Sequence, residues 1–67
     1  MNNSTEQSVI DQANKQIDII FATNMGRPDR ECSLSRVIGW VEGIFAAKDW
    51  SDDICGQFID SVSERNK

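Results

Sequence analysis

The residues of this sequence that could carry chemistry are two cysteines, Cys32 and Cys55, and two adjacent carboxylates, Asp52 and Asp53. A nucleophilic cysteine needs a neighbouring base or a cationic pocket to lower its pKa, and the chain contains no histidine. The two cysteines are too few and too far apart for a disulfide framework or a zinc-binding CxxC pair. We therefore expect two reduced thiols without a catalytic role.

The pair Asp52 and Asp53 is not expected to act on a metal or a substrate. Neighbouring positions on a helix point about 100° apart, so the two carboxylates do not converge on one ion or one bond. The sequence has no glycine-rich nucleotide loop, zinc spacing or calcium loop. A chain of 67 residues also leaves little room to enclose a small-molecule pocket. The sequence thus predicts no enzyme, no catalytic residue, no cofactor, no metal and no small-molecule substrate.

Three amphipathic segments make up most of the chain. The apolar residues of the first recur at three- and four-residue spacing, as in a helix with one buried face. They are Val9, Ile10, Ala13, Ile17, Ile20 and Phe21. We expect Ser4 to cap this helix, Gly26 to end it in the left-handed conformation, and Pro28 to prevent its continuation.

The second and third segments differ in how widely their apolar residues spread around the helix. Those of the second form an arc about 160° wide, which predicts a helix buried on nearly all sides. They are Leu34, Val37, Ile38, Trp40, Val41, Ile44 and Phe45. The third segment begins with Ser51 as its N-cap, and Trp50 before the cap can pack onto Cys55. Its apolar residues share one face of a helix and are Ile54, Cys55, Phe58, Ile59 and Val62.

The pattern predicts one all-α domain over residues 1–67, either a small three-helix bundle or a helical hairpin followed by a short third helix. We expect helices over about 5–24, 31–48 and 52–64, with frayed tails at 1–3 and 65–67. The link at Lys48, Asp49 and Trp50 contains neither glycine nor proline. The second and third helices could therefore also continue as one bent rod.

Gly39, Gly43 and Ala47 form a row of small residues, four apart, on the second helix. A glycine inside a helix costs about 1 kcal/mol relative to alanine, which indicates that the row serves the close approach of another helix. That helix could belong to the same chain or to a second subunit. Trp40 lies at the rim of the row and could be a core residue or an interface anchor. Because a core of this size supplies only about 3–5 kcal/mol, we expect a homodimer formed through the second helix.

These features make partner binding the expected function, with the protein acting as an adaptor, inhibitor or regulatory subunit. The candidate interface consists of Arg36, Gly39, Trp40, Gly43, Ile44, Ala47 and Trp50. The alternative is a nucleic-acid-binding regulator in which the second and third helices form a helix-turn-helix-like motif. A net charge of −4 and an acidic third helix disfavour that alternative.

Composition also bears on location and surface charge. The longest nearly apolar run, 37–47, is interrupted by Glu42 and is too short to cross a bilayer. The first residues lack the basic and apolar parts of a secretion signal, so we expect a cytoplasmic protein, of a size that suits a bacterial, phage or plasmid gene. Arg27, Arg30 and Arg36 form a small basic group around Pro28, and Asp29 and Glu31 are interleaved with them, which favours local ion pairs over a basic binding patch.

Overall fold

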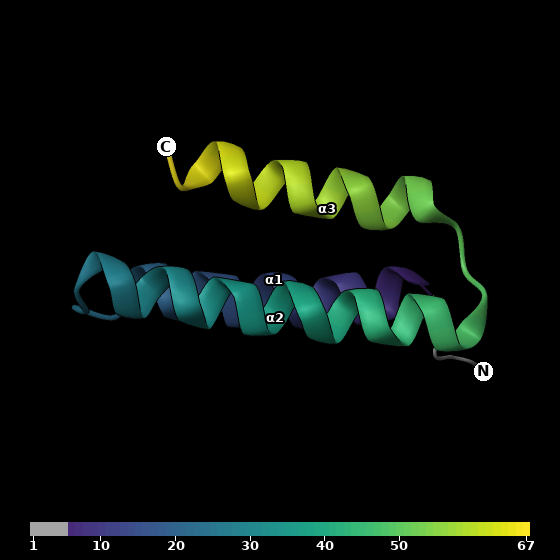
Figure 1. Ribbon diagram of the computed structural model, residues 1–67, viewed down its shortest axis with the longest axis horizontal. Coiled ribbons are helices and arrows are strands. Elements are labelled where there is room, and N and C mark those ends of the chain that lie inside the picture. Colours follow the sequence, from purple (N-terminus) through teal and green to yellow (C-terminus); the bar gives the residue numbers. More distant parts are fainter. Residues whose placement is uncertain (1–5) are drawn as a thin grey trace.

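The computed structural model describes residues 6–67, which form three α-helices and no β-strand. The helices are α1 (Glu6–Ala22), α2 (Arg27–Lys48) and α3 (Asp52–Arg65). They pack side by side into a bundle of 38 × 21 × 17 Å, in which α3 turns back along α2 and α1 lies on another side of α2 (Figure 1). The expected all-α, three-helix architecture is confirmed. None of the helices in residues 6–67 combines the length and the hydrophobicity needed to span a membrane.

The link between α1 and α2 differs from the expectation. Gly26 caps the start of α2 in an extended conformation (φ −66°, ψ 160°) and not in the left-handed one. Pro28 lies in the first turn of α2, where the missing N–H costs no helical hydrogen bond. Pro28 therefore helps to start the second helix, which begins at Arg27 instead of residue 31.

The link between α2 and α3 is a true break, so the bent-rod alternative is wrong. Asp49 adopts the left-handed conformation (φ 56°), and its N–H donates to the Ala46 carbonyl over 3.2 Å. The N–H of Trp50 donates to the Phe45 carbonyl over 2.9 Å, which satisfies a second carbonyl at the end of α2. Ser51 then caps α3, since its hydroxyl accepts a 3.2 Å hydrogen bond from the N–H of Asp53.

The outer helix ends agree with the expected bounds to within two residues. α1 ends at Ala22 instead of residue 24, and α3 ends at Arg65 instead of residue 64. In the C-terminal tail that we expected to fray, Lys67 forms an ion pair with Glu64. The expected cap Ser4, the helix start at residue 5 and the tail at 1–3 lie outside the described residues.

The core runs between the three helices and is apolar, with no charged or polar side chain buried among the described residues. Its buried members are Ile10, Ala13, Ile17, Ile20, Leu34, Val41, Phe45, Cys55, Phe58 and Val62. All of the α1 and α3 members belong to the faces that their spacing predicts. Periodicity thus identified the inner faces of these two helices.

The prediction that α2 is buried on nearly all sides is wrong. Its buried residues are Leu34, Val41 and Phe45, whereas Trp40, Ala46 and Ala47 are exposed. The reason is geometric, because α1 and α3 pack against neighbouring sides of α2 and leave the opposite side uncovered. α2 therefore presents a continuous exposed face to solvent.

Candidate partner-binding site

Five of the seven predicted interface residues share the exposed side of α2, which we call the outward face. They are Arg36, Gly39, Trp40, Gly43 and Ala47. The other two differ, since Ile44 and Trp50 are half-buried. Trp50 meets the ring of Phe45 edge to face, with 5.2 Å between the ring centroids and 83° between the ring planes. Trp50 therefore belongs to the edge of the core and not to the outward face.

The two glycines of the outward face have open space beside them. A methyl group placed on the α-carbon of Gly39 or Gly43 would meet no atom within 4 Å outside its own stretch of helix. Neither α1 nor α3 approaches this row, so the expectation that a helix of the same chain could lie there is wrong. The row remains available to a neighbour from outside the chain.

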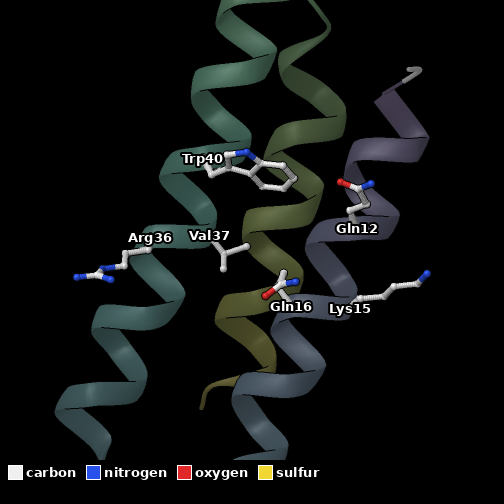
Figure 2. A pocket seen from close by; sticks show the side chains of 6 residues that line it. All are labelled: Gln12, Lys15, Gln16, Arg36, Val37 and Trp40. Carbon is white, nitrogen blue, oxygen red and sulfur yellow. The ribbon is translucent and has the colours of Figure 1, made fainter. Parts of the chain in front are cut away.

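Trp40 borders a groove between α1 and α2, which we call the α1–α2 groove. Its lining consists of Gln12, Lys15, Gln16, Arg36, Val37 and Trp40, and its volume is about 580 Å³. Figure 2 shows Val37 and Trp40 reaching from α2 towards α1, with the two glutamines facing them from α1. Arg36 and Lys15 extend outwards from opposite sides of the groove (Figure 2).

The α1 wall of this groove was not among the residues predicted from the sequence. Gln12, Lys15 and Gln16 have the three- and four-residue spacing of one side of a helix, but polar residues on such a side are typical of any solvated surface. Their role as a groove wall comes from the antiparallel pairing of α1 with α2, which places Gln12 opposite Trp40 and Gln16 opposite Val37 across the groove (Figure 2).

The exposure of Trp40 decides between its two predicted roles. Trp40 is 42% exposed, and with Ile19 at 57% it is one of two large hydrophobic side chains left exposed in residues 6–67. Tryptophan has a large apolar surface and is enriched among the residues that dominate binding energy at interfaces. Trp40 is therefore not a core residue in this chain.

The α1–α2 groove is lined by basic and not by acidic residues, although the chain carries a net charge of −4. Within residues 6–67, three ion pairs join Arg27 to Glu31, Arg65 to Asp18 and Lys67 to Glu64. The first of these confirms the expected local pairing for Arg27, but the expectation is wrong for Arg30, which lies over the ring of Phe21, and for Arg36. Among the described residues, Lys15, Arg30, Arg36 and Lys48 belong to no ion pair. Two of them, Lys15 and Arg36, line the α1–α2 groove, which has no acidic lining residue.

The hollow between α2 and α3 has the opposite character. It is about 280 Å³, and its charged lining residues are the acids Glu42 and Asp52. Negative charge thus gathers at the α2–α3 side of the molecule, while the α1–α2 groove carries positive charge only.

The two cysteines are free thiols in different surroundings. Cys32 is exposed, whereas Cys55 is buried in the core. Burial, and then the negative charges of Glu42 and Asp52, raise the pKa of the Cys55 thiol. A raised pKa keeps this thiol protonated, so Cys55 lacks the activation that a nucleophile needs. Residues 6–67 contain no group of three or more potential metal ligands.

The raised pKa of Cys55 makes the stability of the protein sensitive to alkaline pH. The folded state holds the thiol proton more tightly than the unfolded state, so this contribution is complete below the unfolded thiol pKa of about 8.5 and is lost as pH rises above it. We expect urea denaturation to show a lower free energy of unfolding from about pH 8.5 upwards. The loss should be smaller in Cys55→Ala and unchanged in Cys32→Ser, and an equal loss in all three proteins would contradict the assignment.

The relative placement of α2 and α3 bears on the helix-turn-helix alternative. In that motif the two helices meet at about 90–120°. Here α3 runs back beside α2 (Figure 1), and its first turn carries Asp52 and Asp53. No observation favours groove binding to nucleic acid through α3.

No family model, curated protein or solved structure matches this chain. A functional assignment therefore has to come from the chain's own residues and their geometry.

Proposed function

We propose that this protein is a small protein-binding module that acts as an adaptor, inhibitor or regulatory subunit through the outward face of α2. The observation that carries the proposal is the exposure of Trp40, whose side chain is 42% exposed beside a groove of about 580 Å³. A bundle of this size gains little from its own core, and leaving a tryptophan in water forgoes part of that gain. The exposed ring is explained if a partner covers it.

We further propose that the chain forms a homodimer through the same face of α2. Gly39 and Gly43 cost helix stability and have open space beside them, which suits a second helix at close range. An antiparallel pair of α2 helices centred on Gly43 would set Gly39 of one protomer opposite Ala47 of the other. The two free thiols suit a reducing compartment, in keeping with the expected cytoplasmic location.

Sedimentation velocity tests the proposal directly. The wild-type chain should sediment as a dimer at micromolar concentration, and Gly43→Leu should sediment as a monomer because the larger side chain blocks close approach. Since nothing within the chain lies near Gly43, the variant should remain folded by circular dichroism. A matched control is Gly56→Leu, which places leucine at a position that is also open but lies on α3.

The protein-binding role and the dimer can be separated by affinity capture. Proteins that are retained by the wild type and lost with Trp40→Ala would support binding through the outward face. A wild-type chain that sediments as a monomer would remove the homodimer. If no protein distinguishes the wild type from Trp40→Ala either, the proposed function is wrong.

A further inference from the structure

We propose that the α1–α2 groove binds an acidic amphipathic helix of a partner protein, with two apolar side chains about two turns apart. This inference rests on the proposed protein-binding function and specifies the chemistry of the partner. It concerns the edge of the outward face that borders α1, where Arg36 and Trp40 belong both to the groove and to the outward face. Trp40 lies about 60° from Gly43 around α2, whereas Val37, deeper in the groove, lies about 160° from Gly39.

The basic residues of the groove favour a partner segment that carries carboxylates. Lys15 and Arg36 project from its two sides, form no ion pair among the described residues, and are not opposed by any acidic lining residue. Two carboxylates on the partner could each meet one of these cations. The chain as a whole carries −4, but at physiological ionic strength charges are screened over about 8 Å. Asp11 and Asp18 lie within one turn of Lys15 on α1 and weaken its attraction for a bound carboxylate. Arg36 has no acidic residue within one turn on α2, so it is the stronger of the two cations.

The apolar surface around the groove supplies two anchor positions. Trp40 forms one, on α2 opposite Gln12. Ile19, 57% exposed, supplies the second, because it follows Lys15 by one turn and Gln12 by two turns on the same side of α1. Seven residues of helix span about 10.5 Å, so a helix laid along the groove would present two apolar residues at that spacing.

The shape of the groove favours a helix over a small ligand. Binding pockets enclose about 70–90% of a small molecule's surface, whereas this groove is open to solvent and its main apolar wall, Trp40, is 42% exposed. A groove between two helices is a common binding site for an amphipathic helix of another protein. Two cations are also too few for a nucleic acid, whose affinity comes from many phosphate contacts.

NMR titration with defined peptides tests this proposal. The first probe is a blocked peptide with leucines seven residues apart and glutamate and alanine between them, and the second replaces every glutamate with glutamine. The glutamate peptide should shift the Trp40 indole signal and the backbone amides of Lys15, Ile19 and Arg36. The glutamine peptide should bind about tenfold more weakly, although glutamine favours the helix as much as glutamate does.

A charge reversal in the groove provides the matched variant. Lys15→Glu combined with Arg36→Glu should weaken binding of the glutamate peptide by about tenfold or more, because like charges then face each other. The control combines Lys48→Glu with Lys67→Glu, which changes the net charge equally at exposed positions outside the groove. Binding by this control should stay close to wild type, and both variants should keep the wild-type circular dichroism spectrum.

Several outcomes would overturn the proposal without touching the proposed function. Equal affinity for the two peptides would remove the acidic character of the partner. Absence of binding by either peptide, both to the wild type and to the monomeric Gly43→Leu variant, would remove the groove as a docking site. A second copy of the chain would be the occupant if two results came together. The NMR signals of the groove residues would shift when the protein alone is diluted, and the combined Lys15→Glu and Arg36→Glu variant would no longer dimerise.

Discussion

Replacing Phe45 with alanine is expected to leave about half of the protein or more unfolded at room temperature. Phe45 is 2% exposed, and its ring packs edge to face with that of Trp50. Truncating a buried phenylalanine costs about 3–5 kcal/mol, through lost burial and the cavity that remains. A single core in a chain of this length supplies about the same amount in total. Far-UV circular dichroism should therefore show a large loss of helix, and urea should no longer give a clear folded baseline.

Trp40→Ala is the matched control for this loss. It removes a still larger ring from the same helix, but the ring is 42% exposed, so less buried surface is lost. Alanine also favours the helix more than tryptophan does. The control should keep most of the wild-type helical signal. If the two variants lose helix to the same extent, the division of α2 into a buried side and an outward face is wrong.

The inner faces of α1 and α3 could be predicted from the sequence because both helices are amphipathic in a simple way. A narrow apolar stripe, such as Ile10, Ala13 and Ile17, can be buried by a single layer of neighbours, so periodicity alone identifies it. Ser51 could be predicted as a cap for a similar reason, since its hydrogen bond to the Asp53 N–H involves residues two apart. Local chemistry decides both features.

The environment of α2 could not be predicted in the same way. A wide apolar arc shows which side chains would gain from burial, but not how many neighbours the chain can supply. With two other helices available, Val41 becomes buried while Trp40 stays exposed. The α1–α2 groove likewise depends on the register between two antiparallel helices, which brings Gln12 and Lys15 beside residues far away in the sequence. Such long-range pairing leaves no mark on the spacing within either helix.

Replacing both Gly39 and Gly43 with alanine is expected to raise the stability of the monomer by about 2 kcal/mol. Each substitution removes the conformational entropy cost of a glycine inside a helix, about 0.8–1.0 kcal/mol. The added methyl groups meet no atom within 4 Å, so no steric penalty offsets the gain. For a domain of this size the melting temperature should rise by about 8–16 °C. The measurement belongs at a protein concentration low enough for the wild type to be monomeric, because dimerisation adds its own stabilisation.

Gly56→Ala separates the effect of helix propensity from the effect on association. Gly56 also has open space beside its α-carbon, but it lies on α3 and not on the outward face. Its replacement should stabilise the monomer by about 1 kcal/mol and leave the dimer dissociation constant unchanged. The double variant of α2 should instead gain monomer stability and lose dimer affinity, since its methyl groups separate the two backbones. A loss of monomer stability in that variant would mean that a part of the same chain covers the glycine row. Opposite signs for folding and association would explain why the chain keeps two glycines in its longest helix at the expense of stability.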